Sequence, residues 1–243
     1  MKKHIPNTIT CLNLVCGCIA IVCAFEGNLV WSAYLVGIAA VLDFLDGFAA
    51  RILKVHSEIG KQLDSLADMV TFGVVPGMVM LVLIHESLLE NKKWVSYLFY
   101  DKQIPIPVLA FFITIFSALR LAKFNIDTRQ TDSFIGLPTP ANALLICSLP
   151  LIIKYSPELR YVVMNSQLLL FLTFLLSYLL IAELPLFALK FKNFGWADNK
   201  IRYVFLIISL VLLIVFQFVA IPLIIFLYII MSVVNNRFLA DSH

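Results

Sequence analysis

Four aspartates in two otherwise apolar stretches are the residues best suited to chemistry in this sequence. Asp43 and Asp46 are three residues apart and Asp64 and Asp68 are four apart, so each pair shares one face of a helix. Carboxylates inside apolar helices are costly and usually mark a functional site. If the two helices form an antiparallel hairpin around the polar turn near residues 55–56, all four carboxylates should converge at one depth.

Two kinds of site tolerate such a cluster of acids. Some of the carboxyls could be protonated, as in a proton pathway, or divalent cations could neutralise them. Oxygen ligands without His or Cys favour Mg²⁺, Mn²⁺ or Ca²⁺. Two such ions bridged by shared carboxylates match the arrangement used for in-line displacement at phosphorus.

The remainder of the sequence indicates which elements position these acids. Apolar and aromatic residues (AVILMFWYC) make up 61% of the 243 residues and charged residues only 14%, which excludes a soluble fold of this size. We therefore expect an all-α, polytopic transmembrane helical bundle with about eight helices. The predicted spans are 5–25, 29–54, 58–85, 105–125, 138–155, 166–190, 201–218 and 220–235. The break between the last two, near Ala220–Pro222, also allows a single kinked helix.

The distribution of cations predicts the orientation. With eight spans, thirteen of the 18 Lys and Arg residues fall on the side of the N-terminus, which indicates that this side is cytoplasmic. An even number of spans places the C-terminus on the same side. We expect one transmembrane domain over residues 1–243, with a catalytic hairpin at 29–85, extra C-terminal helices at about 201–235, and a location in the cell membrane.

Small residues and one cation accompany the acids. Gly47, Ala50 and Gly60 lie within about one helical turn of an aspartate. They could let a neighbouring helix approach closely, or leave room for a ligand beside the acids. Arg51 could pair with a carboxylate, meet a phosphate, or extend toward the membrane surface.

The complete pattern is D-x2-D-G-x2-A-R-x8-G-x3-D-x3-D, from Asp43 to Asp68. It resembles the signature of the CDP-alcohol phosphotransferases. The resemblance implies a core of six transmembrane helices, here with two more, and a polar active site open to the cytoplasm. It implies two Mg²⁺ or Mn²⁺ ions, Asp68 as the general base, and CMP as the leaving group. The implied metal ligands are Asp43, Asp46, Asp64 and Asp68, and the implied CDP-binding residues are Asn7, Thr10, Asp43, Asp46, Gly47, Ala50, Arg51, Gly60 and Asp64.

Further stretches resemble the phosphatidylserine synthases of the membrane-embedded bacterial and archaeal type. They are 5–14, 117–125 and 134–141, so the resemblance covers most of the first 142 residues. It implies CDP-diacylglycerol and L-serine as substrates, phosphatidylserine as product, and a homodimer. The implied acceptor-binding residues are Arg120, Lys123, Asn125, Gly136 and Pro138.

A physical argument supports this acceptor site. Arg120 and Lys123 fall at the cytoplasmic end of the fourth predicted span, where Arg can bind the carboxylate of serine through two hydrogen bonds. Gly136 and Pro138 precede the fifth span, where a loop-to-helix turn offers free N–H groups. The same residues also fit positive-inside topology and ordinary loop chemistry.

Two alternatives stay open. The acceptor could instead be glycerol 3-phosphate or inositol phosphate, although a phosphorylated acceptor should need more cations than Arg120 and Lys123 supply. A cation-coupled transporter could use the same acids, but it would be expected to show internal repeats or broken helices, and the sequence shows neither.

Overall fold

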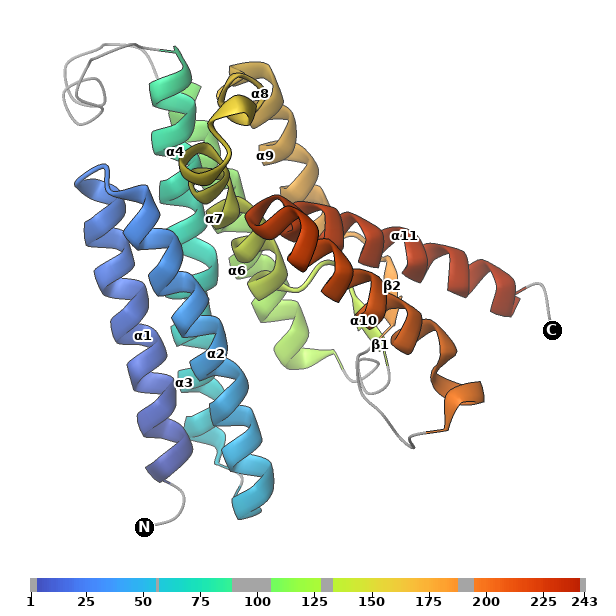
Figure 1. Cartoon of the computed structure of the whole chain (residues 1–243). Helices are drawn as coiled ribbons and strands as arrows, with labels where there is room; N and C mark the ends of the chain where they lie inside the picture. Colours follow the sequence, from blue (N-terminus) through green and yellow to red (C-terminus); the bar gives the residue numbers. More distant parts are fainter. Residues whose placement is uncertain (1–3, 56, 89–105, 128–132, 188–194, 241–243) are drawn as a thin grey trace.

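The structure is a computed structural model that describes residues 4–55, 57–88, 106–127, 133–187 and 195–240 (Figure 1). Helices α1 (His4–Phe25) and α2 (Leu29–Leu53) form an antiparallel pair. Gly27 has a φ of 76° in the turn between them, and the Asn28 side chain caps α2 by accepting from the Trp31 N–H. Both helices end close to the predicted positions.

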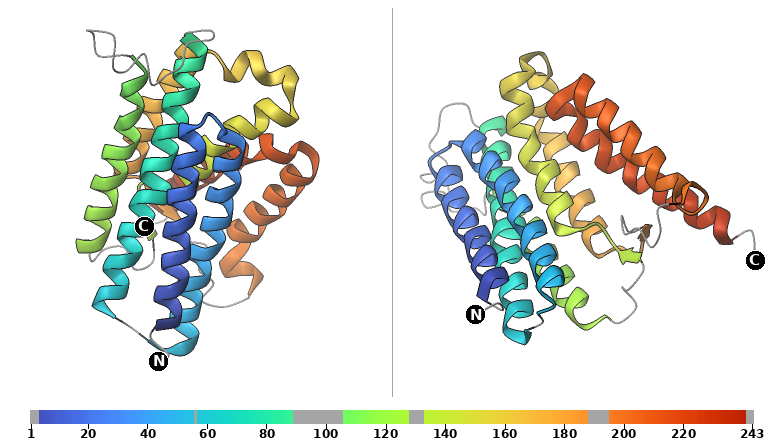
Figure 2. Two further views of the ribbon diagram at one scale, coloured as in Figure 1. Left: turned by 90° about the vertical axis from the view of Figure 1, so that its left-hand side faces the viewer. Right: turned by 60° about the horizontal axis from the view of Figure 1, so that its bottom comes forward.

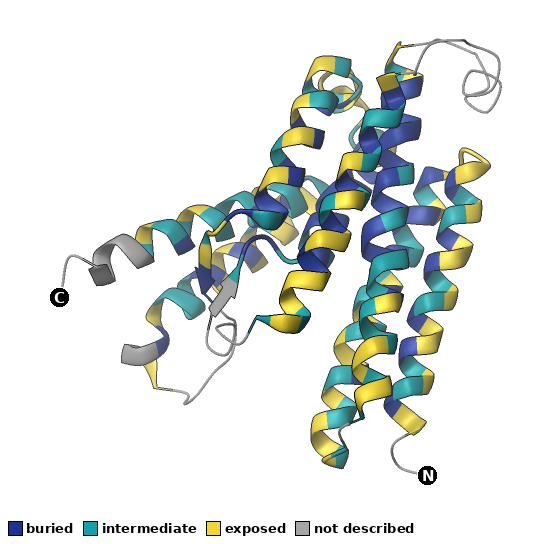
Figure 3. Ribbon diagram, turned by 180° about the vertical axis from the view of Figure 1, so that it is seen from behind, coloured by how far each residue is buried: buried dark blue, intermediate teal, exposed yellow. Residues whose placement is uncertain are grey.

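The third predicted span is one continuous helical rod made of three parts. They are α3 (Glu58–Asp68), the π-helix η1 (Met69–Val74) and α4 (Val75–Leu88). Ser57 caps the rod by accepting from the Gly60 N–H at 3.1 Å. The α4 part is the most enclosed helix of the bundle, with α1, α6, α7 and α9 against it, and appears dark blue in Figure 3. The rod therefore runs through the core of the bundle.

The central helices complete the bundle. The 3₁₀ turn η2 (Ile106–Ala110) leads into α6 (Phe111–Ile126), and α7 (Thr139–Tyr155) packs against α2. The short η3 (Pro157–Leu159) and α8 (Arg160–Val163) precede α9 (Ser166–Ile181), at an angle of 70° to it. Figure 2 shows these helices from two further directions.

The sixth predicted span, 166–190, was too long. Helix α9 ends at Ile181, and the chain then becomes extended and forms strand β2 (Pro185–Phe187). This strand pairs antiparallel with β1 (Ser133–Ile135), with Ile135 opposite Pro185. A short buried strand and the end of a buried helix are equally apolar, so composition could not separate them. Residues 188–190 lie outside the described part of the chain.

The last two predicted spans are separate helices. Helices α10 (Trp196–Phe216) and α11 (Ala220–Ala240) are joined by the 3₁₀ turn η4 (Gln217–Val219). The chain reverses there, with Gln217 at a φ of 49°, and the two helices pack on each other (Figures 1 and 2). A single kinked helix is therefore excluded.

Length and composition make this a multi-pass membrane protein. In the described residues, five helical stretches are long and apolar enough to cross a bilayer, and the longest of them, Asn199–Asn235, covers most of α10 and α11. Helix α7 has 17 residues and is also apolar. Many large apolar side chains are exposed on the helices, as lipid contact requires. Exposed residues are yellow in Figure 3.

Candidate active site

The acidic residues of α2 and α3 meet inside the bundle. Carboxylate oxygens of Asp43, Asp64 and Asp68 lie within 4.8 Å of one another, and all three residues are half-buried. The expected antiparallel hairpin is thus present, with Asp43 level with Asp68.

Asp46 lies beside this cluster and is held by a third helix. Its Oδ2 accepts a hydrogen bond of 2.6 Å from the hydroxyl of Thr10 on α1. Asp46 is only 6% exposed, so a partner for its carboxylate is important. Helix α1 therefore belongs to the site, and it brings Asn7 and Thr10 to the same place.

A cavity of about 240 Å³ opens between the ends of α1, α2 and α3. Seven of the nine residues predicted to bind CDP line it, and Asp43 adjoins it through the acid cluster. Arg51 is exposed on the last turn of α2 and does not line it. The lining residues are Pro6, Asn7, Thr10, Asp46, Gly47, Ala50, Val55, Ser57, Gly60, Lys61 and Asp64.

The two glycines of the cavity have different surroundings. A Cβ on Gly47 would meet no atom within 4 Å, whereas a Cβ on Gly60 would come within 2.9 Å of Asn7 Oδ1. Gly47 thus leaves open space beside Asp46, and Gly60 lets α3 approach α1. Both readings that the sequence allowed occur, one at each position.

A second cavity, of about 340 Å³, lies between the ends of α6 and α9. Arg120 and Lys123 line it, as do the acids Asp127 and Glu183. Arg120 is 7% exposed and interacts electrostatically with Asp68, which links this cavity to the acid cluster. The remaining lining residues are Phe124, Ile126, Ile135, Leu180 and Ile181.

The other three residues predicted to bind the acceptor do not line this cavity. Asn125 joins α6 to α3, because its Nδ2 donates to Ser65 Oγ at 2.8 Å and its carbonyl accepts from Lys61 Nζ at 3.1 Å. Gly136 has a φ of 77° and donates its N–H to the Leu184 carbonyl at 3.0 Å. Pro138 is the residue that precedes α7.

A comparison with models of known protein families shows to which family this chain belongs. Residues 3–179 match the profile of the CDP-alcohol phosphatidyltransferases, and this stretch contains every residue of both cavities except Leu180, Ile181 and Glu183. The chain belongs to that family. It is therefore an enzyme of the phosphotransferase class, as the signature from Asp43 to Asp68 predicted.

Three relatives share the name CDP-diacylglycerol–serine O-phosphatidyltransferase. The Helicobacter pylori protein (strain 26695) is 31% identical over 96% of this chain and 91% of its own length. The Bacillus subtilis protein is 35% identical over 65% of this chain and 80% of its own length. The Methanocaldococcus jannaschii protein is 34% identical over 58% of each chain.

The acid cluster of this family member suits hard divalent cations. Its three carboxylates are near enough to share an ion, and oxygen is the only donor type that they offer. Asp68 Oδ1 is buried and has no hydrogen-bond partner in the described part of the chain. An oxygen atom that coordinates a ligand would have this environment before the ligand binds. Gly47 leaves open space for a ligand beside Asp46, at the edge of the cluster. The residues fit Mg²⁺ or Mn²⁺.

Sequence reasoning missed several residues of the two cavities. Ser57 and Lys61 line the first, and the Ser57 capping position before a helix could have identified it. Glu183 lines the second, and its only sequence signal was an acid next to Pro185 in an apolar region. The π-helix after Asp68 had no recognisable signal.

Proposed function

We propose that this chain transfers the phosphatidyl group of CDP-diacylglycerol to the hydroxyl of L-serine, releasing phosphatidylserine and CMP. The observation that carries the proposal is the acid cluster of Asp43, Asp64 and Asp68 next to a cavity lined by signature residues. The second cavity contributes Arg120, which interacts with Asp68. The names of the relatives support serine as the acceptor.

In this proposal the first cavity receives the CDP group. Asn7, Thr10, Gly47, Ala50 and Gly60 would border the nucleotide, and Arg51 would lie near the membrane surface. Asp43, Asp46, Asp64 and Asp68 would hold two Mg²⁺ or Mn²⁺ ions. Such ions, when bound, neutralise the diphosphate and stabilise the charge that develops on the departing CMP.

The second cavity would receive serine, with its carboxylate on Arg120 and Lys123. Asp68 takes the proton of the serine hydroxyl, because its buried Oδ1 has no hydrogen-bond partner among the described residues and Arg120 of the second cavity interacts electrostatically with it. The serine oxygen then forms a bond to the β-phosphorus, and the bond from that phosphorus to the bridging oxygen breaks as CMP leaves. The proton passes from Asp68 to solvent.

Asn125, Gly136 and Pro138 would then act by building this cavity. Asn125 fixes α6 against α3, and Gly136 fixes the loop before α7 against the end of α9. We further propose that the active site faces the cytoplasm of the cell membrane, that both termini lie on that side, and that the single-domain chain forms a homodimer. Tags on each terminus, probed in sealed cells, would test the orientation.

The deciding experiment measures CMP release by the purified chain in detergent with CDP-diacylglycerol and Mn²⁺. The acceptors compared are L-serine, glycerol 3-phosphate, inositol phosphate and none. We expect release only with serine and its loss on chelation. Release with another acceptor would overturn the serine assignment but keep the chemistry. Absence of release in folded protein would favour the transporter alternative.

A further inference from the structure

The second cavity carries charges of both signs, and the proposed function so far uses only the positive ones. Arg120 and Lys123 come from the last turns of α6, and Asp127 follows directly after that helix. Glu183 comes from the opposite wall, between α9 and β2. A cavity with cations on one wall and an acid on the other suits a ligand that carries both charges.

The guanidinium group of Arg120 is held in an orientation that suits the binding of an anion. Its Nη1 donates to Thr139 Oγ1 at 3.2 Å, and its guanidinium lies 5.6 Å from the centre of the Phe124 ring. These contacts fix the side chain, yet its buried Nε has no hydrogen-bond partner in the described residues. A buried, oriented and incompletely satisfied guanidinium favours a carboxylate ligand.

Glu183 is held on the facing wall by the backbone on each side of it. The N–H of Ala182 donates to Tyr178 at 2.9 Å, and the carbonyl of Leu184 accepts from Gly136 at 3.0 Å. The pairing of β1 and β2 begins at Pro185, two residues later. The Glu183 side chain itself is exposed, whereas Asp127 already makes another contact. Glu183 is thus the acid that this cavity presents to a ligand.

We infer that Glu183 binds the α-ammonium group of the acceptor and so makes the site selective for an amino acid. This inference rests on the proposed function, because it assigns a partner to the group that distinguishes serine from other hydroxyl compounds. An acid at this place would also repel a phosphorylated acceptor, which adds discrimination by like charge. Arg120 and Glu183 together would then fix both ends of the zwitterion, leaving its hydroxyl directed toward Asp68.

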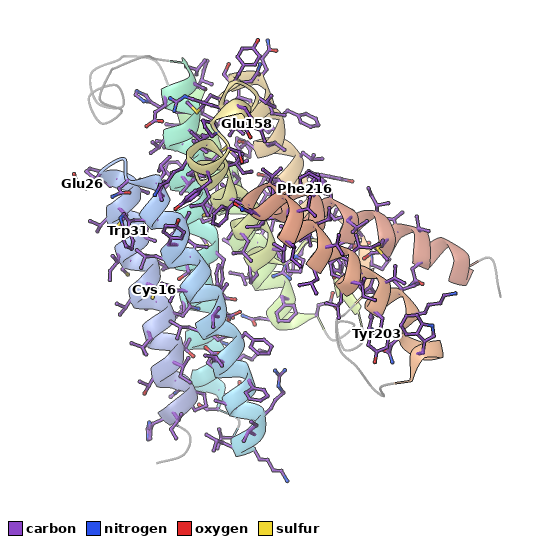
Figure 4. The ribbon with its side chains drawn as sticks, in the orientation of Figure 1. Cys16, Glu26, Trp31, Glu158, Tyr203 and Phe216 are labelled. Atoms are coloured by element: carbon purple, nitrogen blue, oxygen red, sulfur yellow. The ribbon has the colours of Figure 1, made fainter. Side chains whose placement is uncertain are left out.

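The test compares Glu183→Gln with the wild type, and Glu26→Gln serves as the matched control. Glu26 is an exposed acid in the α1–α2 turn, at the far end of α1 from the first cavity (Figure 4). Steady-state CMP release is measured against L-serine and against CDP-diacylglycerol. Inhibition by 3-hydroxypropionate, which has the hydroxyl and carboxylate but no ammonium group, is measured in parallel.

We expect Glu183→Gln to raise the KM for L-serine about 10- to 100-fold, as for the loss of a charge-assisted hydrogen bond. The KM for CDP-diacylglycerol and inhibition by 3-hydroxypropionate should change less than twofold, and Glu26→Gln should match the wild type. An unchanged KM for serine, or equal weakening of serine and 3-hydroxypropionate, would overturn the inference while leaving the proposed function intact. Failure of the wild type to use serine would overturn both.

Discussion

The hydroxyl of Thr10 on α1 donates a hydrogen bond of 2.6 Å to Oδ2 of Asp46 on α2. It joins a helix outside the aspartate signature to one of its carboxylates. We expect Thr10→Val, which keeps the shape but removes the donor, to lower kcat/KM about 10- to 100-fold. Thr10→Ser should keep most of the activity. Equal activity of the Val and Ser variants in CMP release would contradict a role for this bond.

Removal of a single carboxylate from the cluster should abolish turnover. Asp43→Asn, Asp64→Asn and Asp68→Asn each remove one of three oxygens that lie within 4.8 Å of one another. We expect CMP release to fall by about 10²–10⁴-fold in each, without loss of folded protein in size-exclusion chromatography. Full activity in any of the three would exclude the mechanism proposed above.

Divalent cations should stabilise the protein through the same residues. Three carboxylates so close together repel one another, and a ligand that binds only the folded state raises its stability. We expect millimolar Mg²⁺ or Mn²⁺ to raise the melting temperature of the wild type, with a much smaller rise in Asp64→Asn. Chelation should reverse the effect. An equal rise in the melting temperature of the wild type and of Asp64→Asn would mean that the cation binds at another site.

Gly47→Ala tests the open space of the first cavity. A methyl group on Gly47 would meet no protein atom, so it would occupy the cavity next to Asp46. Gly37→Ala on the same helix is the matched control, because its Cβ also meets nothing within 4 Å and Gly37 does not line the cavity. We expect only Gly47→Ala to raise the KM for CDP-diacylglycerol, while both keep or gain thermal stability. Equal KM values for CDP-diacylglycerol in the two variants would argue against nucleotide binding in the first cavity.

Gly136→Ala should destabilise the wall between the second cavity and α7. Gly136 has a φ of 77°, and a Cβ there would come 2.6 Å from the Leu180 carbonyl oxygen. Gly27 has nearly the same φ but free space around it, so Gly27→Ala isolates the cost of the backbone conformation, about 1–2 kcal/mol. We expect a clearly larger loss of thermal stability at Gly136. Similar losses would mean that the loop moves to accommodate the methyl group.

The sequence predicted the acid cluster well because its information is local. Spacings of three and four residues put each pair of aspartates on one helix face, and one short turn fixes the hairpin, so Asp43 and Asp68 had to meet. Arg120 and Lys123 were predicted from the family resemblance and from their place at one end of a span, and both line the second cavity. The long apolar helices were equally accessible, since few other structures bury so many apolar residues.

Relationships between distant segments were not predictable in this way. Glu183 lines the same cavity as Arg120 at the place where β2 pairs with β1, and the short sequence Pro185–Phe187 does not indicate a strand partner about fifty residues away. Asn125 was predicted to bind the acceptor because it lies close to Arg120 and Lys123 in the sequence. Its hydrogen bond to Ser65 depends instead on how α6 packs on α3. Helix packing, rather than composition, decides both.

The π-helix at Met69–Val74 makes the central rod intolerant of changes in length. Its wider turn sets the angular offset between the carboxylates of α3 and the enclosed surface of α4. Insertion or deletion of one residue there would rotate everything after it by about 100°. Homologous chains should therefore differ in length at the loops, and keep a fixed residue count from Asp68 to the end of this segment.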